Sequence, residues 1–141
     1  MGGIVMEQKD KELLLKDLCA RLPCGVKIKL IRWIDEGLYI NTTLEPDDIE
    51  RLLNDEDGDT EIKPYLFPLS SMTEEQYNEF ITISNWNCDI GDIRRGRFSS
   101  ISYIGLDCIY DTIDWFNKNH FDYRGLIEKG LAINATGLNI Y

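Results

Sequence analysis

The pattern of apolar and polar positions, together with the placement of prolines, predicts two helices within residues 9–53. Apolar residues recur at helical spacing from Lys9 to Arg21, with charged residues between them. Pro23 and Gly25 follow directly and end the pattern. Pro46 suits a first helical turn, and the acidic residues after it favour the positive end of a helix dipole. We therefore expect a second, shorter helix from Pro46 through Leu53.

The second half of the chain carries signals for further helices. Thr73 and Gln76 have the spacing of a capping box, in which each side chain accepts a hydrogen bond from the other's backbone N–H. The apolar pattern then predicts a helix after Thr73, and another over residues 107–119. Asp122 is expected to cap a short last helix near residues 124–129.

The strand signals lie between these helices. Residues 26–34 and 38–44 alternate apolar with polar positions across a short turn, which predicts an antiparallel hairpin. Residues 63–69 are apolar but contain two prolines, each lacking a backbone donor, so we expect an extended segment along the core surface rather than a central strand. Residues 90–97 are expected to form a connector, and residues 98–104 are ambiguous, with a strand as one option.

Together these elements predict a single α+β domain over residues 1–141. Its small antiparallel sheet, including the hairpin 26–44, is expected to pack against three or four helices. A chain of 141 residues with 43% hydrophobic residues is large enough to bury a core without cross-links. The sequence has no apolar run near the ~18 residues of a membrane span and no secretory signal, so we expect a cytoplasmic protein without a membrane partner.

The four cysteines lack the close paired spacing of a zinc site. In a reducing compartment, disulfides are disfavoured and free thiols are common core residues. We therefore expect buried free thiols at Cys19, Cys24, Cys88 and Cys108.

The net charge of −10 is concentrated in one block. Residues 45–61 contain nine acidic residues and one basic residue, and so carry eight of the ten net negative charges. Aligning Gly58 with the glycine of an EF-hand loop puts Leu53 and Pro64 at the two end ligand positions, where neither can bind calcium. The segment near residues 54–61 is therefore interpreted as a solvated acidic loop.

Two groups of residues have the chemistry of a catalytic site. Asp107, Asp111 and Asp114 share one face of the predicted helix and could hold Mg²⁺ or Mn²⁺, although they equally fit the solvent side of an amphipathic helix. His120 with Asp122 could be a general base and its orienting acid, or could simply mark the end of one helix and the start of the next. No cofactor is predicted, because neither of the standard nucleotide-binding glycine loops occurs.

The one basic cluster consists of Arg94, Arg95 and Arg97. Three arginines on an acidic protein are a small electrostatic footprint for nucleic acid, and Asp89 and Asp92 lie near enough in sequence to pair with them. A nucleic-acid partner is therefore not favoured.

Three stretches taken together resemble a family of small proteins found in bacterial genomes, often in prophage-like regions. They are residues 11–23, residues 63–73 (KPYLFPLSSMT) and residues 120–127 (HFDYRGLI). The resemblance covers about half of the chain and leaves out the acidic block. It implies an intracellular accessory role, with a phage or mobile element as one setting, and it assigns no catalytic residue or cofactor.

Two functional hypotheses follow. The first is a non-enzymatic protein-interaction module that binds another protein through Tyr65, Phe67, Tyr123 and Arg124. The alternative is a small metal-dependent hydrolase or nuclease that uses the Asp107, Asp111 and Asp114 face with His120. The oligomeric state is not predicted.

Overall fold

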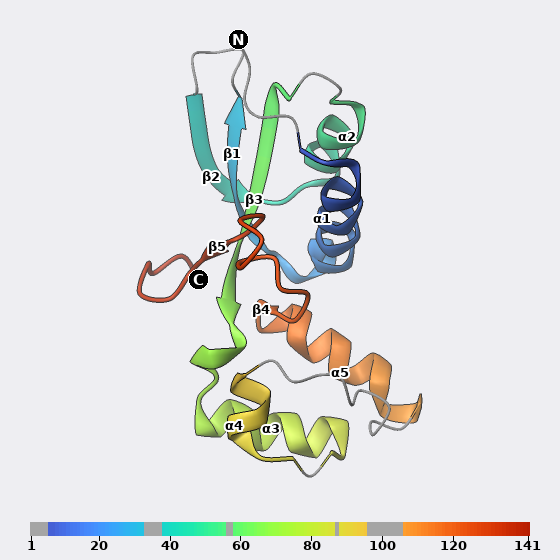
Figure 1. Ribbon diagram of the computed structural model, residues 1–141, viewed down its shortest axis with the longest axis vertical. Helices are drawn as coiled ribbons and strands as arrows, with labels where there is room; N and C mark the ends of the chain where they lie inside the picture. The colour runs from blue at the N-terminus through green and yellow to red at the C-terminus, as the bar shows by residue number, and fades with distance from the viewer. Residues whose placement is uncertain (1–5, 33–37, 56–57, 87, 96–105) are drawn as a thin grey trace. The chain divides into compact units, whose positions relative to one another are not determined.

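The computed structural model describes residues 6–32, 38–55, 58–86, 88–95 and 106–141 (Figure 1). The chain divides into two compact units, and β3 passes from one to the other. Unit 1 comprises residues 1–66 and 124–141, and unit 2 comprises residues 67–123. Each unit has its own cluster of buried apolar residues. The predicted α+β fold is confirmed.

Two helices of unit 1 match their sequence signals. Helix α1 (Gln8–Arg21) gives way to a 3-10 turn (Leu22–Cys24), and Gly25 then adopts a left-handed φ of 69° that favours glycine. Helix α2 (Pro46–Asn54) begins with proline and a capping box, in which the Glu45 N–H donates to the Asp48 carboxylate at 2.9 Å.

The sheet of unit 1 is built on the predicted hairpin. Strand β1 (Lys27–Arg32) pairs antiparallel with β2 (Leu38–Thr43) on one side and with β3 (Thr60–Pro68) on the other. The turn between β1 and β2 lies outside the described residues. The sheet is mixed rather than purely antiparallel, because β5 (Ile133–Asn134) joins β3 in parallel.

Alternating apolar residues of this sheet face the two helices. Ile28 and Ile62 are fully buried in one cluster with Leu14 and Leu18 of α1 and Leu52 of α2. In Figure 1, α1 and α2 accordingly lie together against one face of the β1–β3 sheet. The amphipathic pattern of the first half of the chain thus accounts for most of the core of unit 1, and Leu126, Leu131 and Ala132 complete it.

The proline-containing segment is a central strand, which corrects the sequence prediction. Pro64 lies opposite Ile28, at the end of the antiparallel ladder with β1. The parallel ladder with β5 begins at the next residue, Tyr65. Pro64, which lacks an N–H, therefore lies at the point where the pairing partner of β3 changes from β1 to β5. Pro68 ends the strand, so neither proline interrupts the middle of a ladder.

The C-terminal residue bridges the two main strands at this point. The Lys27 N–H donates to the Tyr141 hydroxyl at 2.9 Å, and that hydroxyl donates to the Tyr65 carbonyl at 2.7 Å. The register of β1 and β3 places Lys27 opposite Tyr65, one position beyond the last ladder pair. The phenol therefore continues the ladder beyond Pro64, and its burial raises the pKa of Tyr141 to about 12.

The predicted last helix is wrong. Residues 126–130 form turns, the Lys129 N–H donates to the Gly125 carbonyl at 3.3 Å, and Gly130 takes a φ of 74°. Asp122 lies in strand β4 (Phe121–Asp122) rather than at a helix N-terminus. The segment is too short to add the intrahelical bonds that offset the cost of starting a helix.

Unit 2 is mainly helical. Helix α3 (Glu74–Ser84) has the predicted capping box, with the Gln76 N–H donating to the Thr73 hydroxyl at 3.1 Å, and it ends at Asn85 with a left-handed φ of 53°. A 3-10 turn (Leu69–Ser71) precedes it. Helix α5 (Leu106–Lys118) matches the predicted helix, and β4 after it pairs in parallel with the end of β3.

The predicted connector is in part a short helix, α4 (Ile90–Arg94). Gly91 does not break it, and Ile93 is buried in the apolar cluster of unit 2. That cluster is largely aromatic, with the Phe80 ring 5.8 Å from Trp115 and 5.4 Å from Phe116. The proposed strand over residues 98–104 lies outside the described residues.

All four cysteines are free, as predicted, but they are not all buried. Cys19 is exposed on α1, and Cys24, Cys88 and Cys108 are half-buried. The apolar stripe of α1 buries Leu14 and Leu18, and Cys19, one residue beyond Leu18, falls outside the buried part of that stripe.

Candidate functional site

The aromatic residues of the predicted binding surface pack within their own units. In unit 2 the Tyr123 ring stacks on Phe116, with ring centroids 5.4 Å apart, and its hydroxyl donates to the Asn117 side chain at 2.9 Å. Phe67 packs against the same apolar cluster. In unit 1 Tyr65 is buried, and its hydroxyl donates to the Asn41 side chain at 2.7 Å. These contacts give all three rings a structural role.

Arg124, the fourth predicted binding residue, belongs to a buried charge cluster in unit 1. Its Nε donates to one carboxylate oxygen of Asp17 at 3.2 Å, and Arg21 Nε donates to the other oxygen at 2.7 Å. The side chains of Asp17 and Arg21 are fully buried. The cluster joins α1 to the turn after β4.

His120 and Asp122 have structural positions at the end of α5. The His120 N–H donates to the Asn117 carbonyl at 3.2 Å, and its own carbonyl accepts from the Phe67 N–H at 2.8 Å. Its φ of 61° ends the helix, and histidine tolerates this left-handed conformation better than most residues. Asp122 is buried in β4 opposite Pro68. His120 thus follows the end of α5, as one of the two interpretations expected, but Asp122 lies in β4 and starts no helix.

The predicted metal ligands do not come together with a histidine in the described structure. Asp111 and Asp114 are exposed on α5, and the side chain of Asp107 lies outside the described residues. Among the residues that are described, no three His, Cys, Asp or Glu side chains are close enough to hold a metal ion. The hydrolase alternative therefore finds no assembled metal centre there.

Asp111 and Asp114 instead line a groove between α3 and α5, which we call the α3–α5 groove. It has a volume of about 480 Å³, within the range of ligand-binding clefts. A neighbouring hollow of about 340 Å³ extends it along α3. The two share Thr82 and Ile83, and the full set of lining residues is Asn78, Glu79, Thr82, Ile83, Asp111, Asp114, Trp115 and Lys118.

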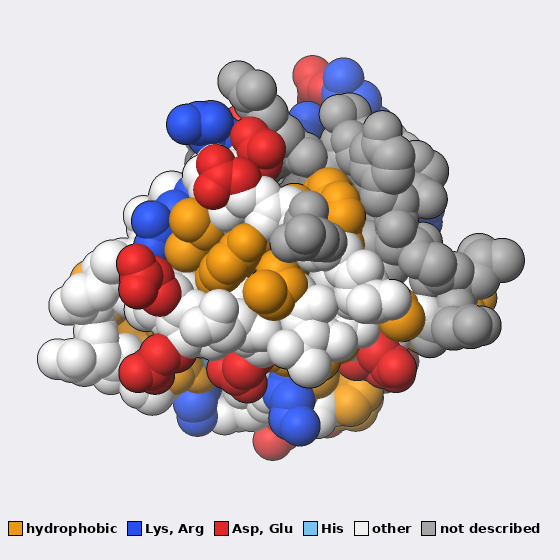
Figure 2. Space-filling model, turned by 90° about the horizontal axis from the view of Figure 1, so that it is seen from below, with side chains coloured by type: hydrophobic (Ala, Val, Ile, Leu, Met, Phe, Trp, Pro, Cys, Tyr) orange, Lys and Arg blue, Asp and Glu red, His pale blue; other side chains and the backbone are white. Residues whose placement is uncertain are grey.

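Helical spacing explains how α5 contributes to this groove. Its four lining residues fall at positions i, i+3, i+4 and i+7 from Asp111 to Lys118, and so share one face. Ile83 and Trp115 supply the apolar part, while Glu79, Asp111 and Asp114 are exposed acids. The lining is thus apolar with an acidic margin. Figure 2 shows one face of the molecule, on which hydrophobic side chains gather with acidic side chains around them.

Trp115 is the least exposed residue of the groove lining. Its side chain packs in the aromatic cluster, with its ring 5.6 Å from that of Phe121. The indole Nε1 is buried and finds no hydrogen-bond acceptor among the described residues. A buried donor without an acceptor costs about 1–3 kcal/mol.

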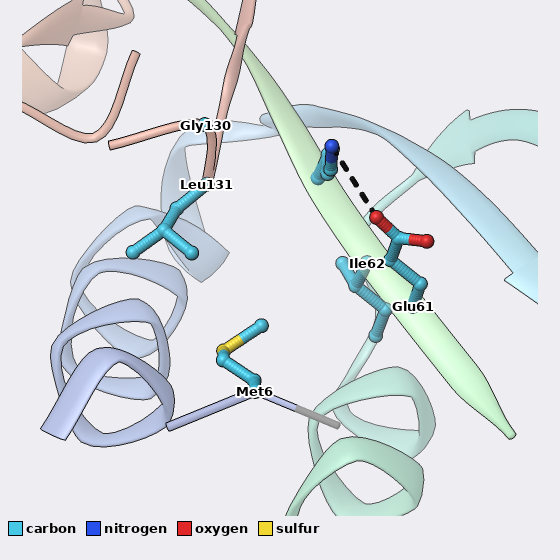
Figure 3. Close-up of a pocket in the computed structure, with 6 residues that line it drawn as sticks. Met6, Glu61, Ile62, Gly130 and Leu131 are labelled. Carbon is cyan, nitrogen blue, oxygen red and sulfur yellow. Dashed lines mark ion pairs between the residues drawn. The ribbon is translucent and has the colours of Figure 1, made fainter. Parts of the chain in front are cut away.

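A second cavity lies in unit 1, between β3 and the turn at Gly130 (Figure 3). Met6 and Leu131 supply side chains on one side, and Ile62 and Glu61 of β3 lie on the other. Lys63 pairs with Glu61 at 3.3 Å. The volume of about 140 Å³ is below the range of ligand clefts, so this cavity suits a few waters rather than a substrate.

The basic cluster is partly used within unit 2. Both Nε and Nη2 of Arg94 donate to the Met72 carbonyl, at 2.9 and 2.7 Å. Arg95 pairs with Asp92 at 3.4 Å, as the sequence suggested, and Arg97 lies outside the described residues. The Arg94 contact fixes α4 against the segment before α3.

The α3 side of the groove was not predicted from the sequence. Its lining positions on α3 run from Asn78 to Ile83, and nothing in their pattern distinguishes them from an ordinary solvent face. The available signal was Ile83, an apolar residue beside the exposed Thr82 near the end of the helix. Only the packing of α3 on α5 joins these positions to the acidic face of α5.

Comparisons with known protein families, with curated proteins and with solved structures found no match. Within the described parts of the chain, every helix is too short or too polar to cross a membrane. The functional inference therefore depends on the geometry of the groove.

Proposed function

We propose that the protein is a non-enzymatic interaction module that binds another protein through the α3–α5 groove of unit 2. The observation that carries this proposal is the groove itself, which combines apolar Ile83 and Trp115 with the exposed acids Asp111, Asp114 and Glu79. An accessory role in a phage or mobile element stays a prediction from the motif resemblance.

The shape of the groove favours a helical partner segment. Two helices flank it, and its two hollows continue along α3 through Thr82 and Ile83. Amphipathic helices commonly bind such grooves with apolar residues at positions i, i+3, i+4 and i+7. The apolar residues of the partner helix would contact Ile83 and Trp115.

The charges favour a basic segment. Three acids and one base, Lys118, have charged groups at the groove, and the whole chain has a net charge of −10. Opposite charges at the margin of an interface accelerate association and select partners, and salt weakens this effect. The preferred partner is therefore an amphipathic helix with lysine or arginine on its polar side.

A titration followed by ¹H–¹⁵N NMR tests this proposal. The probe is a synthetic Lys/Leu amphipathic helix of about five turns, added to the full chain. The Trp115 indole N–H, assigned with the Trp115→Phe variant, reports directly on the groove. A peptide with the same leucines and with glutamate in place of lysine is the matched control.

We expect the basic peptide to shift the Trp115 indole resonance and the backbone resonances of Ile83, Thr82 and Asp114. The acidic peptide should leave them in place. If the basic peptide shifts only residues of the acidic block 45–61, the attraction is a general charge effect and the groove is not the site.

A further inference from the structure

The sheet of unit 1 has an open edge at β2. Strand β2 is the outermost strand, and among the described residues only β1 pairs with it. Its sequence, Leu38 to Thr43, contains neither a charged residue nor a proline, although 40 of the 141 residues of the chain are charged. Edge strands are usually protected from pairing by lysine, proline or a bulge.

The register identifies the backbone groups that face outward. The Leu44 N–H donates to the Val26 carbonyl at 2.9 Å, so the even-numbered residues of β2 direct their backbone groups toward β1. Residues 39, 41 and 43 therefore present their N–H and C=O groups to the open edge. These residues are arranged symmetrically about Asn41.

The side chains of β2 also allow a further strand to pair at this edge. Ile40 lies opposite Leu30 on the face of the sheet that the helices cover, yet 51% of its surface is exposed. Asn41 is held on the other face, because its side chain accepts the Tyr65 hydroxyl. A strand added at this edge would cover Ile40 and leave that hydrogen bond intact.

We propose that a second copy of this chain adds to the edge, with β2 of each copy pairing antiparallel about a two-fold axis at Asn41. In this register, Asn41 of one copy forms a hydrogen-bonded pair with Asn41 of the other, and residue 39 pairs with residue 43. Ile40 of each copy lies opposite Thr42 of the other. Every cross-strand pair is uncharged, so no like charges oppose one another.

The occupant is a second copy because the strand is complementary to itself in this register. Shifting the two copies by two residues would bring Glu45, outside the strand, opposite residue 39 and shorten the ladder. The contact is small, since one strand pair buries less than the ~1,200 Å² of a standard interface, and we expect a weak dimer. Because both copies are negatively charged, added salt should strengthen it.

Sedimentation velocity of the full chain over a range of concentrations, at low and high salt, tests the dimer. The disruptive variant is Ile40→Lys, which puts a charge on the edge. Leu53→Lys is the matched control, because Leu53 is also an exposed apolar residue of unit 1, at 60%, and the charge change is the same. We expect the wild type and Leu53→Lys to dimerise and Ile40→Lys to bind at least about tenfold more weakly.

Hydrogen exchange of the backbone amides provides a second measurement that does not depend on a variant. The Asn41 and Thr43 amides should exchange more slowly as the wild-type concentration rises. A chain that stays monomeric at high concentration in high salt would overturn the proposal. So would a dimer that Ile40→Lys leaves unchanged, or one in which these two amides stay unprotected. None of these outcomes bears on the α3–α5 groove.

Discussion

Substitution of Asp17 by alanine is expected to be the most damaging single change in unit 1. The carboxylate is fully buried and accepts hydrogen bonds from Arg21 at 2.7 Å and from Arg124 at 3.2 Å. Its removal takes away the counter-charge of Arg21, whose side chain is also fully buried. Breaking a buried ion pair from one side costs about 3–5 kcal/mol, because the remaining charge stays desolvated. We expect a loss of this size in the free energy of unfolding.

Two further variants separate the contribution of Arg124 to stability from that of the buried pair of Asp17 with Arg21. Arg124→Ala removes the hydrogen bond from Arg124 Nε to Asp17, made by a side chain that is 25% exposed, and it leaves the pair of Asp17 with Arg21 in place, so we expect a loss of about 1–2 kcal/mol. The double variant Asp17→Leu with Arg21→Met replaces both buried charges by apolar side chains of similar volume. Its stability should lie close to that of the wild type, since such replacements are often neutral or stabilising.

Urea denaturation followed by far-ultraviolet circular dichroism measures all three variants. A loss of 3–5 kcal/mol is a large part of the ~5–15 kcal/mol of a typical domain, so Asp17→Ala can already be partly unfolded without urea. The double variant then remains informative, because recovery of folding shows that the buried charge is the cause. A loss of less than about 1 kcal/mol in Asp17→Ala, or a double variant as unstable as Asp17→Ala, would show that the uncompensated buried charge is not the cause of the destabilisation.

Three further predictions concern single groups. Tyr141→Phe should cost about 1–2 kcal/mol through the loss of the hydroxyl bridge. Because the folded pKa of Tyr141 is raised to about 12 from 10.0, this contribution is complete below pH ~10 and lost as the pH rises toward 12, so denaturation curves of wild type and variant should converge there. Thr73→Ala should cost about 1 kcal/mol by removing the cap of α3, whereas Thr82→Ala on the same helix should cost clearly less in the same denaturation assay. Burial raises the pKa of the Cys88 thiol, so mass spectrometry after a brief iodoacetamide pulse at pH 8 should find Cys88 less alkylated than the exposed Cys19; equal labelling would contradict this.

The sequence predicted the elements that are stabilised by contacts within one helical turn or one hairpin. The signals for these elements depend only on contacts between residues that are close in sequence. Examples are the capping box at Thr73, the proline at the start of α2 and the alternation of the hairpin. Pro64 was misjudged because its cost depends on which strand lies beside it, and the change of partner from β1 to β5 joins residues far apart in the chain. Asp122 was misjudged for a similar reason, since its pairing with Pro68 overrides its preference for a helix cap.

The sequence predicted the α5 side of the candidate site but not the α3 side. Helical spacing placed Asp111 and Asp114 on one face of α5, and the structure confirms that placement. The sequence could not show that Ile83 of α3 lies beside this face, because only tertiary packing joins the two helices. Tyr123 and Arg124 suggested a binding surface by their chemistry, but the sequence does not show that Asn117 and Asp17 already engage them.

The most direct test of the proposed function is the affinity of the basic amphipathic peptide for two charge-matched variants. Asp111→Asn with Asp114→Asn removes two acids from the groove, and Asp47→Asn with Glu50→Gln removes two exposed acids from α2. Fluorescence anisotropy of the labelled peptide at low salt should show affinity reduced about fivefold or more in the groove variant. The α2 variant should bind as the wild type does. Equal loss of affinity in both variants, or no loss in the groove variant, would contradict the assignment of the α3–α5 groove as the binding site.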